Sequence, residues 1–290
     1  MPIGLRIIGI IIAVLAAAYG LYAGMGNSTG NFDGEMQIFA LDVGQGDSFF
    51  IISPNGKTML IDSGESSNSK QIEQFIREKG VRQLDVVIGS HTHSDHVGSM
   101  PYLLDAFDVG KYVMSEAGLE TRIQKRINAV LEEKDIPCSY VWAGDVIDWD
   151  SDCKVTVLSP VPEFDEYSKT DWNEWSLIIR AEYANHSMIF TGDATVRSEQ
   201  AAMLNNEKYL FDADVLKVPH HGSTTSSSLG FLEAVSPEYA IISVGKGNSY
   251  GHPDYDTIQK LKQVNAEIYR TDELGTINIV FSADDIKITY

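Results

Sequence analysis

The stretch His91-Thr92-His93-Ser94-Asp95-His96 places three imidazoles and a carboxylate within six residues. It follows the apolar run 84–88, which predicts a buried strand that ends where these side chains begin. Imidazole and carboxylate are the usual nitrogen and oxygen ligands of zinc, manganese and iron. The alternative, a polar loop that caps the next helix, rarely gathers metal ligands so densely. The stretch therefore predicts a divalent-metal site.

Most of the remaining histidines also follow apolar runs. His220 and His221 come after the run 214–218, and His252 comes shortly after the run 239–244. Because strand ends in α/β folds meet at one sheet rim, we expect these imidazoles to converge with the 91–96 stretch. His186 is the exception, since Ala184-Asn185-His186-Ser187 is typical of a hairpin turn at the surface.

Strand-like and helix-like segments alternate along the chain. Apolar runs predict strands at 37–43, 48–53, 58–62, 84–90, 154–159, 177–183, 188–191, 214–219, 240–244, 267–270, 276–281 and 285–289. Helical spacing predicts helices at 68–78, 97–106, 120–133, 197–204, 227–235 and 255–264. Strands flanked by helices in this way suit a four-layer αββα sandwich, an α/β fold.

These motifs resemble those of the metallo-β-lactamase fold hydrolases, whose hallmark is the HxHxDH pattern at 91–96. Leu60-Ile61-Asp62-Ser63-Gly64 and Ile189-Phe190-Thr191-Gly192-Asp193 match two further motifs of that family. More narrowly, the chain is similar to the extracellular hydrolase domain of the ComEC/Rec2 DNA-uptake proteins from about Glu35 to its C-terminus. The segments that carry this likeness are 41–48, 217–223, 243–245 and 250–253.

The resemblance implies two divalent metal ions that share Asp193. The first would be held by His91, His93 and Asp193, and the second by Asp95, His96, Asp193 and His221. A histidine that many family members carry about twenty residues before the bridging Asp is absent; Asn173 and Ser176 occupy that region. With one imidazole fewer, the first site is richer in oxygen, so manganese stands beside zinc as a candidate.

The chemistry implied by this ligand set is hydrolysis by a metal-activated water. The expected catalytic residues are Asp62, Asp95, His220 and His252. Asp62 would orient the metal loop from behind the ligands, and His220 or His252 would contact a phosphoryl oxygen or protonate the leaving group. Two alternatives stay open: His220 rather than His221 as the ligand, and His252 as a plain turn residue in Gly-His-Pro.

The N-terminus carries a long apolar stretch. Residues 7–25 contain no charge and would span about 28 Å as a helix, close to the roughly 30 Å hydrocarbon core. We expect residues 1–25 to be a signal peptide or membrane anchor, 26–36 a linker, and 37–290 a single hydrolase domain preceded by that hydrophobic helix. Arg6 on the short N-terminal side predicts an extracellular domain, secreted or anchored to the membrane.

The net charge of −19 bears on the substrate, because the whole-chain balance shows no strongly basic nucleic-acid groove. The alternative is that the charge only keeps a secreted or salt-tolerant protein soluble. DNA cleavage would then depend on metals to neutralise the phosphate, with a separate DNA-uptake pore as an expected partner. The alternatives are another extracellular phosphoester such as cell-wall phosphorylcholine, a β-lactam, and a surface protein with a decayed site. The intact ligand positions argue against decay, and the absent third-motif histidine argues against a β-lactam.

Cys138 and Cys153 are the only cysteines. An oxidising location would allow them to form a disulfide worth on the order of 3 kcal/mol, which is our expectation, with two separate buried thiols as the alternative.

Overall fold

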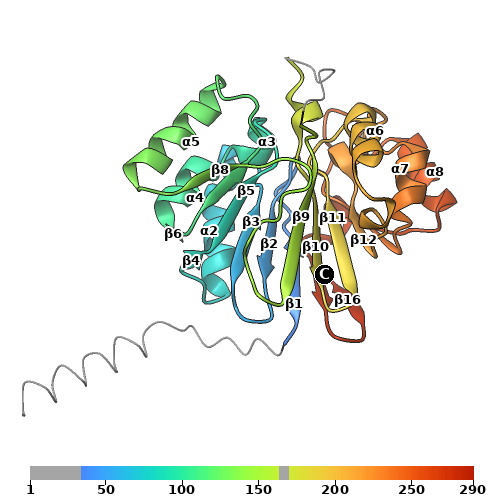
Figure 1. Ribbon diagram of the computed structural model, residues 1–290, viewed down its shortest axis with the longest axis horizontal. Helices are drawn as coiled ribbons and strands as arrows, with labels where there is room; N and C mark the ends of the chain where they lie inside the picture. The colour runs from blue at the N-terminus through green and yellow to red at the C-terminus, as the bar shows by residue number, and fades with distance from the viewer. Residues whose placement is uncertain (1–33, 163–169) are drawn as a thin grey trace, which may run out of the picture.

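Two mixed β-sheets lie face to face, with helices on their outer sides (Figure 1). The computed structural model describes residues 34–162 and 170–290. The expected N-terminal hydrophobic helix and most of the 26–36 linker fall outside this range. Within the part of the chain that is described, no helix is long and apolar enough to cross a membrane. Secretion and anchoring therefore stay predictions of the sequence.

The larger sheet has eight strands in the order β16-β15-β1-β2-β3-β5-β7-β8. Neighbours from β16 to β3 are antiparallel, whereas β3, β5, β7 and β8 run parallel. The bounds are β1 (Met36–Ala40), β2 (Phe49–Ile52), β3 (Thr58–Ile61), β5 (Val86–Gly89), β7 (Tyr112–Met114), β8 (Cys138–Tyr140), β15 (Ile277–Phe281) and β16 (Ile286–Thr289).

The second sheet has six strands in the order β14-β13-β12-β11-β10-β9. Strands β11 to β14 run parallel, so their carboxyl ends reach the same rim. The bounds are β9 (Cys153–Ser159), β10 (Ile178–Tyr183), β11 (His186–Phe190), β12 (Val215–Lys217), β13 (Tyr239–Ile242) and β14 (Glu267–Arg270). A small separate pair joins β4 (Gln83–Leu84) to β6 (Asp108–Val109).

Side chains alternate between the two faces of each strand, and both faces of the sheets are apolar. In β1, Met36, Ile38 and Ala40 belong to the apolar core between the two sheets, while Phe39 belongs to the core beneath the helices of the larger sheet. Successive side chains of a strand point to opposite faces, so a strand covered on both sides has to be apolar on both. The αββα prediction is therefore confirmed for the described residues.

The helices cover the outer faces of both sheets (Figure 1). Those packed on the larger sheet are α2 (Ser69–Glu78), α4 (Met100–Ala106) and α5 (Arg122–Glu133), and those on the smaller sheet are α6 (Val196–Asn205), α7 (Leu229–Val235) and α8 (Tyr255–Gln263). Two helices of four residues are α3 (Ser94–Val97) and α9 (Thr271–Leu274). N-caps fix several starts: the side chains of Thr121, Thr195 and Ser228 each accept a backbone N–H of the first turn.

The expected disulfide is wrong in this structure, because Cys138 and Cys153 are both free thiols. Cys138 is exposed on β8, at the edge of the larger sheet, whereas Cys153 lies on β9, at the edge of the smaller one. The two cysteines therefore lie in different sheets, although they are close in sequence. Burial raises the pKa of the Cys153 thiol to about 12, which keeps it protonated and unreactive at neutral pH.

Candidate metal centre

The predicted metal loop leaves the carboxyl end of β5 and leads into α3. His91 and His96 are buried, while His93 lies at the edge of the site. The Nε2 atom of His91 is 3.1 Å from Nδ1 of His93. That separation suits either a hydrogen bond between the rings or a shared tetrahedral zinc, whose nitrogen ligands lie about 2.0–2.1 Å from the metal.

Asp62 holds this loop from behind. It follows β3 in the left-handed region, with φ of 60°. Its carboxylate accepts hydrogen bonds from the backbone N–H of Ser90 at 2.8 Å and from the Ser90 hydroxyl at 2.7 Å. His96 donates its Nδ1 proton to Asp62 at 2.8 Å. The Nε2 atom of His96 is thereby turned toward the centre, as in carboxylate–histidine–metal triads.

The smaller sheet supplies the other half of the site. Asp193 follows β11, and the two adjacent histidines lie in the 3₁₀ turn η4 (Pro219–Gly222) after β12. Both His220 and His221 have left-handed backbones, with φ of 52° and 54°. Such conformations cost about 1–3 kcal/mol each and persist where the surrounding structure requires them, typically at functional sites. His221 donates from Nδ1 to the Ser243 carbonyl at 2.9 Å, which leaves its Nε2 facing Asp193.

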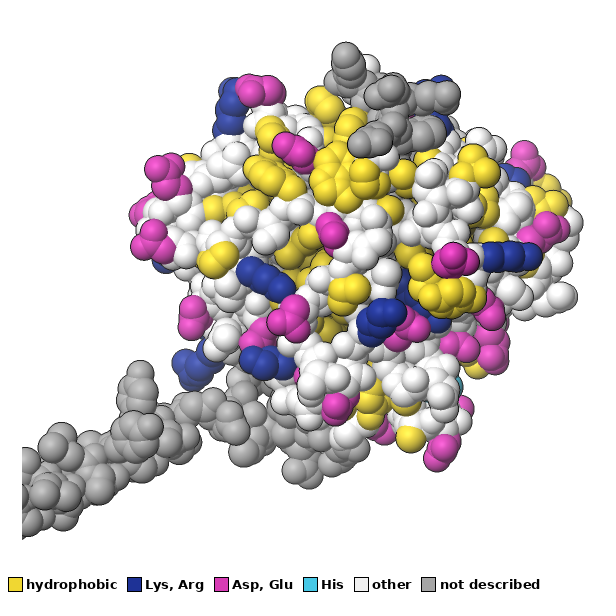
Figure 2. Space-filling model, viewed as in Figure 1, with side chains coloured by type: hydrophobic (Ala, Val, Ile, Leu, Met, Phe, Trp, Pro, Cys, Tyr) yellow, Lys and Arg dark blue, Asp and Glu magenta, His cyan; other side chains and the backbone are white. Residues whose placement is uncertain are grey.

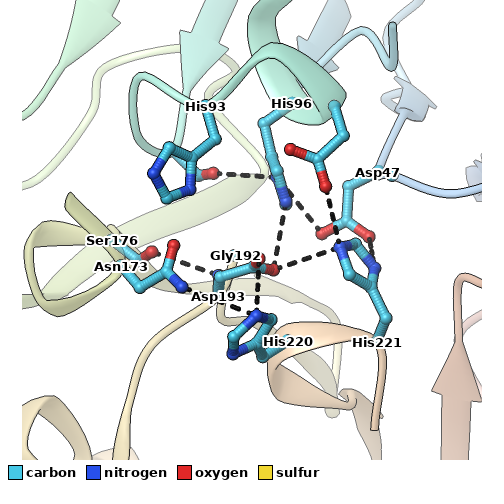
Figure 3. A network of polar contacts seen from close by, with 12 residues as sticks. Asp47, His93, His96, Asn173, Ser176, Gly192, Asp193, His220 and His221 are labelled. Carbon is cyan, nitrogen blue, oxygen red and sulfur yellow. Dashed lines mark hydrogen bonds and ion pairs between the residues drawn. The ribbon is translucent and has the colours of Figure 1, made fainter. Parts of the chain in front are cut away.

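Side chains from the two halves meet around Asp193, with His96 from one half and His221 from the other (Figure 3). Asp95, His96, Asp193 and His221 offer ligand atoms that all lie within 4.8 Å of one another. Asp193 Oδ1 is 3.0 Å from His96 Nε2 and 3.5 Å from His221 Nε2, yet all three atoms are buried without a hydrogen-bond partner. Buried polar atoms are nearly always paired. Their convergence therefore fits a divalent metal ion.

The protonation states also suit metal ligands. Burial raises the pKa of Asp193, but His221 and His96 outweigh it and hold that pKa well below its usual value. Burial likewise raises the pKa of Asp95, and the neighbouring His221 and His96 together lower it well below its usual value. Burial and the neighbouring His96 hold the pKa of His91 well below its usual value, so this ring is neutral. Ionised carboxylates and neutral imidazoles are the forms that bind metals.

His96 and His221 differ from His91. Burial lowers the pKa of His221, but Asp193 and Asp95 raise it above the usual value. Burial also lowers the pKa of His96, but Asp193 and Asp62 raise it well above the usual value. Without a cation, a proton on Nε2 would neutralise the contact with Asp193. A divalent ion would replace that proton, so metal binding at this group would release it to solvent.

The predicted first ligand set lies beside the four-residue group. His91 and His93 are not members of the group, although the His91 and His96 rings are only 4.2 Å apart. In the region without the third-motif histidine, Asn173 lies with its amide nitrogen 3.5 Å from His220 Nε2, and its buried oxygen has no hydrogen-bond partner. Ser176 accepts the backbone N–H of Asp193 at 3.1 Å and so fixes that residue's position.

Two residues of the site were not predicted, Asp47 and Lys217. The Lys217 ammonium is buried, lies 2.5 Å from Asp47 and 3.8 Å from Asp193, and donates to the Gly192 carbonyl. Asp47 also joins Asp62 and His96 in a second group of possible ligands, but the ammonium of Lys217 already neutralises its carboxylate. The signal that could have found Lys217 is a lysine inside an otherwise apolar, buried strand.

Gly46 allows its own segment to pack closely against the metal loop 91–96. Its φ is 128°, and a Cβ atom there would lie 2.1 Å from the carbonyl oxygen of Asp95. Asp47 donates its backbone N–H to that same carbonyl at 3.2 Å, and the Ser243 hydroxyl donates to the Gly46 carbonyl at 2.7 Å. The segment thus ties the metal loop of the larger sheet to the end of β13 in the smaller one.

The ligands open into a pocket of about 280 Å³. The predicted catalytic residues His220 and His252 line it, with ring centroids 5.7 Å apart. His220 is held by a contact of 2.9 Å between Nδ1 and the Thr225 hydroxyl, and burial lowers the pKa of both histidines. The other lining residues are Gln45, His93, Ser94, Asp95, Asn173, Asp193, His221 and Tyr250. His186 lies elsewhere, at the start of β11, and is half-buried against Phe281.

The adjacent histidines should behave differently when replaced. His221→Ala is expected to lower the metal content, because His221 Nε2 faces Asp95 and Asp193 at 3.5 Å. His220→Ala is expected to retain metal and to lower kcat by about 10²-fold, the lower end of the range for acid–base groups. Metal analysis and steady-state kinetics of the two variants check this, and the opposite pattern would exchange their roles.

Comparison with known proteins agrees with the geometry. A family model described as the metallo-beta-lactamase superfamily matches residues 41–246. ComE operon protein 3 of Bacillus subtilis is 34% identical over 260 residues, which cover 84% of this chain and 33% of that protein. Recombination protein 2 of Haemophilus influenzae is 29% identical over 87% of this chain and 30% of that protein. Competence protein ComA of Neisseria gonorrhoeae is 28% identical over 88% of this chain and 34% of that protein. The chain thus spans about a third of the length of these relatives.

Solved structures share the fold. Igni18, a metallo hydrolase of Ignicoccus hospitalis, superposes with a TM-score of 0.57 at 15% identity, covering 85% of this chain and 100% of that one. CmlA, a diiron β-hydroxylase of Streptomyces venezuelae, superposes with a TM-score of 0.53 at 12% identity, covering 81% of this chain and 52% of that one. With the family model covering most of the chain and the hydrolase motifs gathered around one buried ligand group, this protein belongs to the metallo-beta-lactamase superfamily.

Proposed function

We propose that this protein is a metal-dependent phosphodiesterase that cleaves single-stranded DNA outside the cytoplasm. The observation that carries the proposal is the buried ligand group opening into a pocket lined by His220 and His252. The relatives support nucleic acid as the substrate, since their names refer to competence and recombination. The proposed cofactor is two divalent ions per chain, either zinc or manganese, held by the residues named above.

The chain's own residues would divide the work. When bound, divalent ions would supply Lewis-acid stabilisation of a phosphoryl oxygen and a nucleophile at neutral pH. Asp62 orients His96, and Ser176 fixes the backbone of Asp193. His220 and His252, on the pocket wall, are placed to contact a phosphoryl oxygen or to donate a proton to the leaving oxygen.

Charge argues for weak attraction of DNA over long distances. The chain carries 41 acidic and 22 basic residues. Among the residues drawn in colour, the face in Figure 2 shows acidic side chains spread across the surface and no continuous basic area. Delivery of the strand by a separate uptake pore would remove the need for such an area, and an N-terminal anchor would keep the enzyme beside it.

Single-stranded DNA should be cleaved only with added zinc or manganese, slowly at low enzyme concentration, and faster than duplex DNA. A flexible strand bends into a pocket of this size more easily than a duplex. The salt dependence should be shallow, since few Lys or Arg contacts release counterions. Rates on matched single- and double-stranded substrates across a salt series, with EDTA as the blank, check this.

The same assay separates the other hydrolase activities. Nitrocefin tests for a β-lactamase, and a choline phosphoester tests for an enzyme of cell-wall polymers. If DNA stays intact with either metal while the choline phosphoester is hydrolysed, the nuclease proposal is wrong and the cell-wall substrate replaces it.

A further inference from the structure

A second pocket adjoins the metal pocket. It encloses about 480 Å³, and His93 and Ser94 line both cavities. Its walls come from the metal loop, from the first turns of α5, and from Trp172 at the start of the 3₁₀ turn η2 (Trp172–Trp175). A molecule that extends from the metal pocket past His93 would therefore enter this cavity.

Two arginines on α5 distinguish the cavity from the rest of this acidic protein. Arg122 and Arg126 line it, are exposed, and have no ion-pair or hydrogen-bond partner among residues 34–162 and 170–290. Lys125, on the same helix, is paired with Glu120 at 3.0 Å. Among the residues that the structure describes, Glu65 is the one carboxylate that lines the cavity, and its Oε1 already accepts a hydrogen bond from the Ser94 hydroxyl.

The placement of these arginines opposes helix stability. They are four residues apart on one helix, where like charges repel one another. Arg122 is also the first residue of α5, where the helix dipole disfavours a cation. No carboxylate within residues 34–162 and 170–290 pairs with either arginine, so a bound anion would relieve both unfavourable terms.

The remaining wall is apolar and aromatic. Trp172 and Ile123 line the cavity, and both are half-buried. A tryptophan face is a platform on which any nucleobase stacks, and neighbouring arginines are the usual partners of the phosphates on either side. Together, an aromatic surface and two guanidinium groups without a partner in the described part of the chain match a nucleotide better than a simple polyol phosphate.

We propose that this cavity is a nucleotide subsite that binds single-stranded DNA next to the phosphate held in the metal pocket. The base stacks on Trp172, and Arg122 and Arg126 bind the flanking phosphates. The proposal rests on the phosphodiesterase function. It also predicts a value for the shallow salt dependence of DNA binding. Two phosphate contacts on a single strand correspond to a slope of log K against log salt of about −1.4.

Binding without cleavage tests the subsite directly. The anisotropy of a labelled oligothymidylate is measured with the whole protein in EDTA across a salt series. The double variant Arg122→Gln/Arg126→Gln is expected to bind at least about tenfold more weakly and to lose the salt slope of about −1.4. Trp172→Leu should weaken binding about fivefold or more while keeping that slope. Lys125→Gln, the matched control, should behave as wild type.

The possible outcomes are distinct. Equal losses in the double variant and in Lys125→Gln would overturn the subsite, as would wild-type competition by a poly(glycerol phosphate) as effective as DNA of equal phosphate content. Hydrolysis of bis-p-nitrophenyl phosphate by the wild type reports separately on the proposed function. Arginine-dependent binding without any hydrolysis would uphold the subsite and reject the phosphodiesterase; hydrolysis without arginine-dependent binding would do the reverse.

Discussion

Asp193→Ala should abolish metal binding and hydrolysis together while leaving the fold intact. The Asp193 carboxylate lies 3.0 Å from His96 Nε2, 3.5 Å from His221 Nε2 and 3.6 Å from His220 Nε2, so it faces three histidines of the site. Loss of an outer-shell partner typically lowers metal affinity by about 10–100-fold. Removal of the central ligand should exceed that range, and the hydrolytic rate should fall to the level of the EDTA blank.

Metal content per chain and circular dichroism of the purified variant check this expectation. Asp284→Ala is the matched control, because Asp284 is an exposed carboxylate between β15 and β16. Full metal stoichiometry in Asp193→Ala would show that Asp193 is not shared between ions.

Lys217→Met is expected to destabilise the protein by about 3–5 kcal/mol, the usual loss when one partner of a buried ion pair is removed. Lys217 lies 2.5 Å from Asp47, and both side chains are almost fully buried. Methionine fills a similar volume but leaves the Asp47 carboxylate without its cation. Chemical denaturation in EDTA measures the change, so that metal binding does not contribute.

The double variant Lys217→Met/Asp47→Asn should recover part of the loss, because no unpaired charge stays buried. Lys57→Met is the control: its ion pair with Asp85 is half exposed on the lysine side, and surface pairs contribute about 0–1 kcal/mol. Equal losses in the single and double variants would show that the charge of Asp47 does not depend on Lys217.

The sequence predicted the layers because they follow from local pattern. Each strand expected from an apolar run is present, and helices occupy each stretch with helical spacing. The strands β4, β6 and β7 were missed because two or three residues are too few to show a period. One predicted helix at 97–106 is two, α3 and α4, since Gly98 and Ser99 interrupt it.

The metal loop was predictable because its ligands are close in sequence, and the Asp47–Lys217 pair was not. A lysine is rarely buried, and nothing local to it indicates a partner some 170 residues away. The same limit explains the cysteines. Only fourteen residues separate Cys138 from Cys153, but the chain between them passes from one sheet to the other.

The centre draws Asp95 and His96 from one sheet and Asp193 and His221 from the other. A cation there would act as a reversible cross-link that closes a loop of about a hundred residues. The unfolded chain would keep the local ligands of the 91–96 stretch but lose the distant pair, so the ion would favour the native state. At a hundred times its dissociation constant, it would add up to about 2.7 kcal/mol to the free energy of unfolding. The thermal midpoint of this protein would thus rise with the concentration of free metal ion around it. Chelation would weaken the contact between the two sheets although every side chain stays in place.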